Sequence, residues 1–249
     1  MIVVHLYSNK NDMQDLQEQT VAQIVTQNIK SADVFKKHGI DFCCGGNVSV
    51  AKACARKGVD LQTFELELDQ ALSTATTAHN YATWDLGFLV DFIENTHHIY
   101  VRENVEIMLQ YTNRVAEVHA ELHPEVVRIN ELTHSLVAEL MPHMQKEEQI
   151  LFPFIKKLLQ LKKEGKNVSK KFVQSPINVM HMEHENAGDI VKEIASLSKN
   201  FTLPEGACNT YRAMYAKLEE FQNDLFQHIH LENNILFPKA ILLEEQISL

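Results

Sequence analysis

An internal repeat constrains the fold of this chain more than any other feature of its sequence. The stretch from His143 to Pro153 returns 85 positions later as His228 to Pro238, with His, Glu, Ile, Leu, Phe and Pro in matching places. His98 and His184 are related by nearly the same offset, 86 positions. Each half therefore carries one histidine followed, 45 or 44 positions later, by a His-x-x-x-Glu pair. The repeat predicts two duplicated helical hairpins related by a two-fold-like symmetry.

The hydrophobic pattern after the first third of the chain is helical. Long amphipathic segments are expected at 86–121, 125–163, 176–199 and 205–247, with short polar breaks between them. No alternating run of β-branched residues predicts a strand. We therefore predict an all-α fold, an up-down four-helix bundle. Pro142 lies inside the second segment and should bend it.

A small helical module is predicted before the bundle. Its helix starts and stops are marked by Thr20 with Gln23, by Ser31 and Gly39, by Ser49 and Gly58, and by Asp60. The small, polar run at 73–78 is typical of a linker. The predicted domains are residues 15–73, a small helical Cys-Cys-Gly-Gly domain, and residues 84–247, the bundle.

The repeated His-x-x-x-Glu pairs are expected to face the bundle core. Residues four apart lie on one face of a helix, so His143 can reach the same point as Glu147, and His228 the same point as Glu232. Each pair falls on an apolar stripe, of which the first continues from Glu147 to Ile150 and Phe154, and His184 falls on a third one. A buried carboxylate is costly unless it is paired or coordinates a cation. The two pairs therefore predict one shared cation site.

The predicted ligands suit a pair of transition-metal ions. Nitrogen and carboxylate ligands are typical of iron, less often of manganese or zinc, whereas calcium and magnesium prefer oxygen alone. A single His-x-x-x-Glu is most often a surface pair, so the repetition carries the argument. Periodicity leaves His97 and His98 open as alternatives, and the offset favours His98. The predicted set is His98, His143, Glu147, His184, His228 and Glu232, with the two glutamates as bridges.

Composition and charge exclude several other classes of function. The net charge of −10 leaves no excess of basic residues for nucleic acid or an anionic membrane. Four cysteines, two of them adjacent, do not form the framework of a secreted disulfide protein. Neither a secretory signal nor a membrane-spanning stretch is recognisable. We therefore expect a soluble, cytoplasmic protein.

Four motifs together resemble those of a known family. Asp41 to Gly46 contains the Cys-Cys-Gly-Gly sequence, Met180 to His184 resembles a third-helix motif, and the two repeat copies complete the pattern. With these motifs the chain resembles the iron–sulfur cluster repair di-iron proteins, also called RIC or ScdA-type proteins. The resemblance implies a hemerythrin-like bundle with the same six ligands, and His98 in place of His97. It implies two non-haem iron ions with an oxo bridge as the cofactor.

The resemblance also implies a function and partners. The expected protein is a cytoplasmic homodimer that helps to repair iron–sulfur clusters damaged by oxidative or nitrosative stress. Its partners would be damaged or apo iron–sulfur proteins, with nitric oxide or oxygen as small ligands and neither nucleic acid nor membrane. The iron site would release iron or bind nitric oxide, and whether nitric oxide is reduced there stays open. No catalytic residue beyond the metal ligands is predicted.

Four further side chains each allow a functional and a purely structural interpretation. Glu139 and Glu183 are expected either to support the ligands or line an iron exit path, or to be ordinary solvated or salt-bridged glutamates. Cys43 and Cys44 are expected to react with nitric oxide or a partner thiol or to hold a transient metal or cluster. The alternative for the cysteines is a small buried pair that caps a turn.

Two other functions of a metal-binding helical bundle are alternatives to cluster repair. A hemerythrin-like oxygen or nitric oxide sensor would keep its iron and signal through the N-terminal helices, but no segment typical of a signalling output is present. A ferritin-like ferroxidase would carry Glu-x-x-His pairs, whereas the order here is His-x-x-x-Glu. The sensor stays as the alternative.

Overall fold

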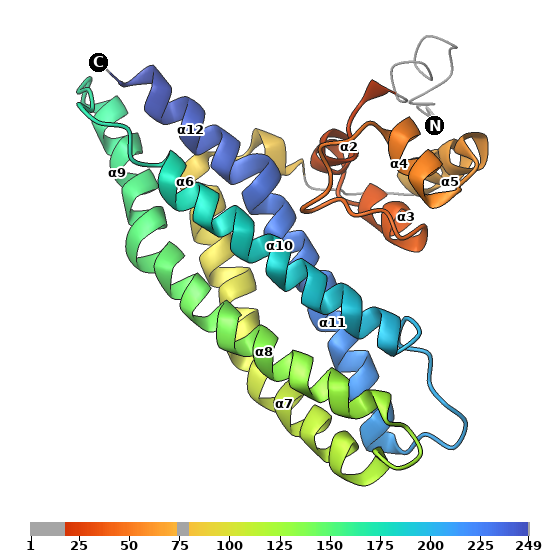
Figure 1. Cartoon of the computed structure of the whole chain (residues 1–249). Coiled ribbons are helices and arrows are strands. Elements are labelled where there is room, and N and C mark those ends of the chain that lie inside the picture. The colour runs from red at the N-terminus through yellow and green to blue at the C-terminus, as the bar shows by residue number, and fades with distance from the viewer. Residues whose placement is uncertain (1–17, 74–79, 249) are drawn as a thin grey trace. The chain divides into compact units, whose positions relative to one another are not determined.

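The structure is a computed structural model that describes residues 18–73 and 80–248 (Figure 1). All the regular elements in these residues are helices, and the only extended pairings there are the isolated bridges Thr20 with Ser49 and Val168 with Ser248. The all-α prediction is confirmed. Of the predicted linker, Ser73 ends a helix, and the rest lies outside the described residues. None of the described helices combines the length and apolar character that a membrane span requires.

The N-terminal helices begin where their capping residues predict. Thr20 Oγ1 accepts a hydrogen bond from the Gln23 N–H at 3.1 Å, and Gln23 Oε1 accepts from the Thr20 N–H at 2.8 Å, which completes a capping box. Ser49 caps the third helix in a similar way. Gly58 ends that helix with a φ of +67°, a left-handed conformation that favours glycine. These helices are α2 (Val21–Gln27), α3 (Ser31–Lys37), α4 (Val50–Lys57) and α5 (Leu61–Ser73).

The bundle helices follow the predicted segments closely. The first consists of α6 (Leu86–Phe92), η2 (Ile93–His98) and α7 (Ile99–His119), and it follows the short 3-10 helix η1 (Tyr81–Thr83). The second consists of α8 (Glu125–Lys146), η3 (Glu147–Leu151) and α9 (Phe152–Lys163). The third is α10 (Gln174–Leu197), and the fourth consists of α11 (Asn209–Leu231), η4 (Glu232–Leu236) and α12 (Phe237–Gln246). Pro142 lies inside α8 without ending it.

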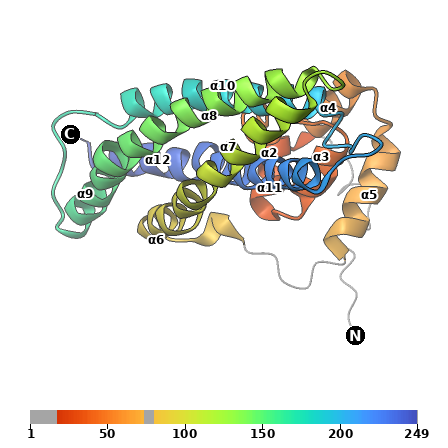
Figure 2. The ribbon, with the colours of Figure 1, turned by 90° about the horizontal axis from the view of Figure 1, so that it is seen from below.

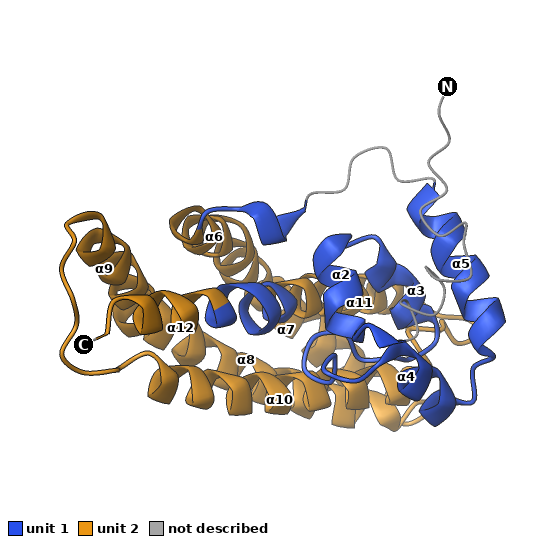
Figure 3. Cartoon of the chain, turned by 90° about the horizontal axis from the view of Figure 1, so that it is seen from above, with its two compact units in different colours: residues 1–85, 229–238 blue, residues 86–228, 239–249 orange. Residues whose placement is uncertain are grey.

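The chain divides into two compact units, which are coloured separately in Figure 3. One unit contains the N-terminal helices and η1 together with residues 229–238 of the last helix, and α2 packs against η4 within it. The other contains residues 86–228 and 239–249. In this second unit α8 lies beside both α7 and α10, and α6 lies beside α9 (Figures 1 and 2).

Three of the four bundle helices contain a π-helical segment at a predicted ligand. η2 ends at His98, η3 begins at Glu147 and η4 begins at Glu232. In η3 the Phe152 N–H bonds to the Glu147 carbonyl five residues back, and η4 repeats this pattern. A proline follows each of these two segments, and its ring would clash with the carbonyl four residues earlier in a regular α-helix. The wider turn relieves that clash and is a feature common at functional sites.

The π segment η3 changes which residues of the second helix are buried. The apolar stripe predicted through Glu147 continues to Ile150 and Phe154, but Ile150 is 51% exposed. That expectation was wrong because a π turn holds an additional residue, so the helix leaves it rotated by one position. Leu151 and Ile155 are buried in place of the predicted pair.

Candidate metal centre

The six side chains predicted to bind metal lie close together in the structure. They form two groups of four, and in each group the atoms able to bind a cation all lie within 4.8 Å of one another. All six residues are buried. The groups are His98, Glu147, His228 and Glu232, and His143, Glu147, His184 and Glu232.

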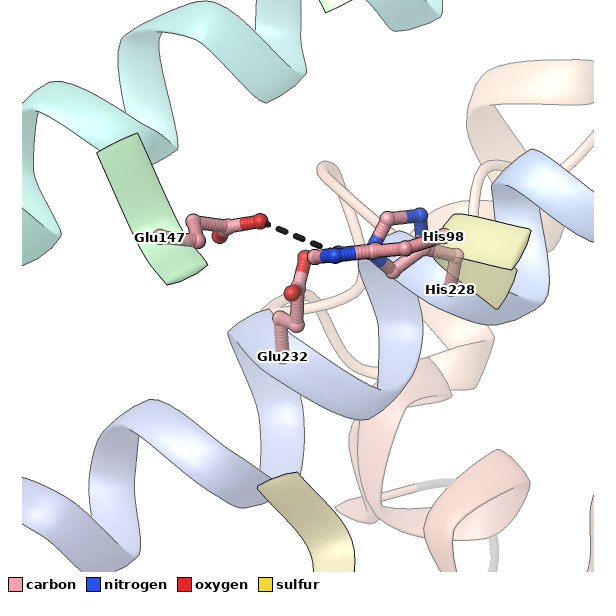
Figure 4. Close-up of side chains that lie close together, drawn as sticks. All are labelled: His98, Glu147, His228 and Glu232. Atoms are coloured by element: carbon pink, nitrogen blue, oxygen red, sulfur yellow. Dashed lines mark hydrogen bonds and ion pairs between the residues drawn. The ribbon is translucent and has the colours of Figure 1, made fainter. Parts of the chain in front are cut away.

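Glu147 and Glu232 belong to both groups, whereas each histidine belongs to one. Oε2 of Glu147 lies 3.4 Å from Nε2 of His98 and 3.4 Å from Nε2 of His143. Figure 4 shows the Glu147 carboxylate directed at the His98 ring, with Glu232 and His228 beside it. The two carboxylates therefore connect the two groups of possible ligands.

Each group takes its two histidines from different halves of the repeat. Nε2 of His98 lies 3.2 Å from Nε2 of His228, and Nε2 of His143 lies 3.0 Å from Nε2 of His184. The first histidine of each half is therefore paired with the second histidine of the other half. The two hairpins contribute equally to both groups.

Two of the imidazole rings make a hydrogen bond through Nδ1, the ring nitrogen that faces away from the centre. These hydrogen bonds determine which ring nitrogen carries the proton. Nδ1 of His98 lies 2.6 Å from Oε1 of Glu148, and Nδ1 of His143 lies 2.8 Å from Oε2 of Glu183. A carboxylate accepts hydrogen bonds, so Nδ1 carries the proton in both rings. In a neutral ring the Nε2 atom then has a lone pair directed into the centre. This is the tautomer that binds a metal, and a carboxylate in this position also makes the ring a stronger ligand.

A basic side chain accompanies each of these supporting carboxylates. Arg102 donates to Glu148, and Lys146 donates to Glu183. Partial burial acts to raise the pKa of both carboxyl groups, but the hydrogen bonds from the basic residue and the histidine outweigh it and hold each pKa below its ordinary value. Glu148 and Glu183 are therefore ionised at neutral pH and keep the rings in the metal-binding tautomer.

The donor set fits transition-metal ions better than any other cation. Glu147 and Glu232 are fully buried, and each lies among imidazole groups. Two buried carboxylates without a cation would be costly in so apolar an interior. Four imidazoles with two carboxylates match the ligand preference of iron, whereas calcium or magnesium would require more oxygen.

Comparison with known proteins agrees with this geometry. Residues 90–240 match the family model described as "Hemerythrin HHE cation binding domain". Residues 17–72 match ScdA_N, described as a "Domain of Unknown function (DUF542)". The bundle is therefore a hemerythrin-like cation-binding domain.

Curated relatives extend over almost the whole chain. The "Iron-sulfur cluster repair protein YtfE" of Yersinia pseudotuberculosis serotype IB (strain PB1/+) is 33% identical over 227 residues, which cover 91% of this chain and 98% of the relative. The protein of the same name from Citrobacter koseri is 34% identical over 224 residues, covering 90% and 97%. The chain belongs to the iron–sulfur cluster repair protein family. The resemblance of its motifs to that family is confirmed.

In this iron–sulfur cluster repair family member, the adjacent cysteines lie in a turn capped by Asp41. Oδ1 of Asp41 accepts hydrogen bonds from the N–H groups of Cys43 and Cys44, each at 3.0 Å. Cys43 is buried and Cys44 half-buried, and both side chains are reduced thiols. The pKa of the Cys43 thiol is raised well above its ordinary value, first by its hydrogen bond with Cys44 and then by burial.

Two residues that the sequence offered as possible ligands or supporting residues lie outside the two groups of possible metal ligands. His97 is buried, and its Nδ1 lies 2.8 Å from Oδ1 of Asp224. Its ring stacks parallel to His228, with centroids 5.4 Å apart. Glu139 is exposed and accepts a hydrogen bond from Asn186. Glu183, in contrast, lies directly behind His143.

The sequence did not predict two further side chains that are candidates for a functional role. Glu148 supports His98 across 50 positions of sequence, and the second repeat copy has Asn233 in its place, so the repeat gives no signal for it. His230 is buried with its ring 5.9 Å from that of Phe42, and burial lowers its pKa to about 4 against a weaker raising effect of a hydrogen bond with the Phe42 backbone. Its position between His228 and Glu232 was the one available signal.

Proposed function

We propose that this chain repairs iron–sulfur clusters damaged by oxidative or nitrosative stress and that it does so with a di-iron centre. The observation that carries the proposal is the sharing of Glu147 and Glu232 by two groups of buried ligands. The names of the relatives supply the biological process. The cofactor is two non-haem iron ions joined by an oxo bridge, and the six ligands are His98, His143, Glu147, His184, His228 and Glu232.

Six protein ligands for two ions leave coordination positions for a small molecule. Bound iron supplies one-electron redox chemistry and affinity for nitric oxide or oxygen at those positions. The protein side chains position and shield it. Glu148 and Glu183 keep the imidazoles of His98 and His143 deprotonated at Nε2, while the apolar core excludes bulk water.

Iron is also the cargo in this proposal. The pairs His143 with Glu183 and His98 with Glu148 connect the buried centre to side chains that are about one-quarter to one-third exposed. Protonation or rotation of Glu183 would weaken the hold on His143, which makes this residue the first step of an iron exit path. Glu139, one turn before His143, is a further carboxylate on that side.

The remaining parts of the proposal concern organisation and partners. Residues 15–73 form the Cys-Cys-Gly-Gly domain and residues 84–247 the di-iron bundle. The clients are damaged or apo iron–sulfur proteins. The protein acts as a homodimer in the cytoplasm, where such clients and reduced cysteines are found. Its adjacent thiols, Cys43 and Cys44, take part in the redox chemistry.

An oxygen or nitric oxide sensor is the alternative function. It would use the same centre but retain its iron. The names of the relatives favour repair over sensing.

The test combines metal analysis with iron transfer. Anaerobically purified protein is expected to contain about two irons per chain and to restore the cluster of an apo iron–sulfur acceptor. Glu147→Leu and Glu232→Leu should lose most of both irons, because each carboxylate serves both positions, and should lose repair. Glu65→Leu is the matched control, since Glu65 is a buried glutamate that belongs to neither group.

Three results would contradict parts of the proposal. If both glutamate variants retained two irons, the ligand assignment would be wrong. Iron that stays bound in the presence of the acceptor, with a change in the protein on nitric oxide binding, would favour the sensor. Zinc in place of iron would remove the redox function and leave a structural centre.

A further inference from the structure

Three further side chains that could bind a metal lie together in the N-terminal unit. They are distant in sequence from the His and Glu residues of the candidate metal centre. The side chains of Asp41, Cys43 and Cys44 bring one oxygen and two sulfur atoms within 4.8 Å of one another. Sγ of Cys43 lies 3.7 Å from Sγ of Cys44 and 3.3 Å from Oδ1 of Asp41. The three atoms form a small triangle.

These separations match the edges of a tetrahedral metal site. Zinc-type ions bind thiolate sulfur at about 2.3 Å, so two thiolates on one tetrahedral ion lie about 3.8 Å apart. A sulfur and a carboxylate oxygen on the same ion lie about 3.6 Å apart. We propose that Asp41, Cys43 and Cys44 form a second metal site, which binds one thiophilic divalent cation of the Fe²⁺ or Zn²⁺ class.

The backbone of the turn holds the three ligands in place. Asn234 donates from Nδ2 to the carbonyls of Phe42 at 3.3 Å and Cys43 at 3.4 Å, and Asn233 also donates to the Cys43 carbonyl at 3.3 Å. A side chain at Gly46 would come within 2.6 Å of the Phe42 carbonyl, so the chain packs tightly on this side too. A fixed turn reduces the entropy lost when a cation binds.

The donor set differs in kind from that of the His and Glu centre. Two thiolates with one carboxylate are softer ligands and select ions with affinity for sulfur. Binding of a divalent cation displaces the two thiol protons, which go to solvent, and no electron is transferred. The site then has a net charge of −1. Asp41 and Cys44 are only partly buried, which leaves the fourth coordination position open to water or to a ligand from another molecule.

Cobalt is the probe that separates the two centres. Bound Co²⁺ shows a thiolate-to-metal charge-transfer absorption in the near ultraviolet only where cysteine is a ligand. The His and Glu centre contains no thiolate and cannot produce this absorption. Reduced, metal-free full-length protein is titrated with Co²⁺ under anaerobic conditions. The His and Glu centre also takes up cobalt, so the charge-transfer absorption is expected to level off at the intensity of one thiolate-bound cobalt per chain once all sites are filled.

The variants test each ligand in turn. Cys44→Ser and Cys43→Ser should each abolish most of the charge-transfer absorption, and Asp41→Asn should weaken cobalt binding about 10-fold or more. Asparagine can still accept the two backbone N–H groups of the turn, so Asp41→Asn changes the charge and leaves the cap. Circular dichroism checks folding, and Cys44→Ser keeps the test valid if the more deeply buried Cys43→Ser fails to fold.

The other two cysteines provide matched controls. Cys54 is buried, and Cys208 is exposed with Sγ 3.3 Å from Nε2 of His119. Cys54→Ser and Cys208→Ser should leave the charge-transfer absorption unchanged. If Cys208→Ser removes it, or if wild-type protein shows none, the proposal is overturned.

A further variant makes the result independent of the di-iron proposal. His143→Ala removes a ligand from the His and Glu centre and leaves the turn intact. The thiolate absorption should persist in this variant at the same cobalt affinity. Its loss there would show that the cysteines bind no metal by themselves and would overturn the proposal, whatever the function of the His and Glu centre.

Discussion

Oε2 of Glu183 lies 2.8 Å from Nδ1 of His143, on the side of the ring that faces away from the centre. Glu183→Gln keeps the size of the side chain but removes the negative charge that favours the Nδ1 proton. We expect iron to dissociate about 10-fold or more faster in this variant. The measurement is the rate of iron transfer to an excess of a coloured chelator.

Glu185 offers the control for that experiment. It lies on the same helix, two residues further on, and it is exposed. Glu185→Gln removes the same charge and should leave the iron release rate unchanged. Equal rates in Glu183→Gln and wild type would show that the hydrogen bond to His143 does not stabilise the metal-bound state.

The buried carboxylates predict opposite effects on stability and metal binding. Glu232 is fully buried. In metal-free protein, Glu232→Leu should raise the free energy of unfolding by about 1–3 kcal/mol, because an apolar side chain of similar size replaces a desolvated charge. The same variant should lose the stabilisation that added iron gives to wild type. Urea unfolding with a chelator, and again with iron, measures both quantities.

Glu139→Leu is the control for Glu232→Leu, because it makes the same substitution, with the same loss of charge, at an exposed position. It should alter the free energy of unfolding by no more than about 0.5 kcal/mol in either condition. A metal-free Glu232→Leu variant that is less stable than wild type would show that the carboxylate already has favourable partners in the core.

The π segment η3 predicts that one deletion is tolerated. Ile150 lies in this segment with its side chain 51% exposed. Removing it should convert the wide turn into an α-helical one and keep the core-facing residues in register on both sides, while the clash of the Pro153 ring with the preceding turn returns. We expect a loss of about 1–3 kcal/mol in the free energy of unfolding, measured by urea denaturation.

Deleting Ala138 gives the comparison. Ala138 is exposed within the regular helix α8, so its removal rotates the flanking residues by one position and turns core side chains to solvent. This variant should be much less stable than the Ile150 deletion or fail to fold. Equal losses would contradict the interpretation of η3 as an inserted residue.

The adjacent cysteines should react at different rates. Only the thiolate is nucleophilic, and the raised pKa of Cys43 keeps this thiol protonated at neutral pH, while Cys44 is more exposed. In metal-free protein, iodoacetamide should therefore alkylate Cys44 well before Cys43, and the Cys43 rate should rise only at alkaline pH. Peptide mass spectrometry over time measures the alkylation of each cysteine. Faster reaction at Cys43 would contradict the raised pKa and the burial of this thiol.

Much of the fold follows from local signals in the sequence. The capping box of Thr20 and Gln23 and the left-handed Gly58 mark helix ends through contacts within a few residues, which a single sequence reveals. The repeat predicted which six side chains the structure brings together because helical spacing and an 85-residue offset are both visible in the sequence. That they bind metal stays a prediction.

The remaining features depend on contacts between distant segments. The exposure of Ile150 follows from a π turn that periodicity cannot show, since the pattern assumes a regular helix. Glu148 and His98 meet only when two helices pack, and no spacing rule connects residues 50 positions apart. The same holds for Asn234, whose amide contacts the turn that carries Cys43.

The crossed pairing of histidines has a consequence for the ancestry of the chain. Because His98 is grouped with His228, and His143 with His184, neither hairpin alone supplies both histidines of either group. A shorter ancestral peptide with one hairpin would have had to associate with a second copy to enclose the ions. Duplication and fusion of its gene removes the dependence on concentration, since the two halves are then always present in equal number and cannot diffuse apart.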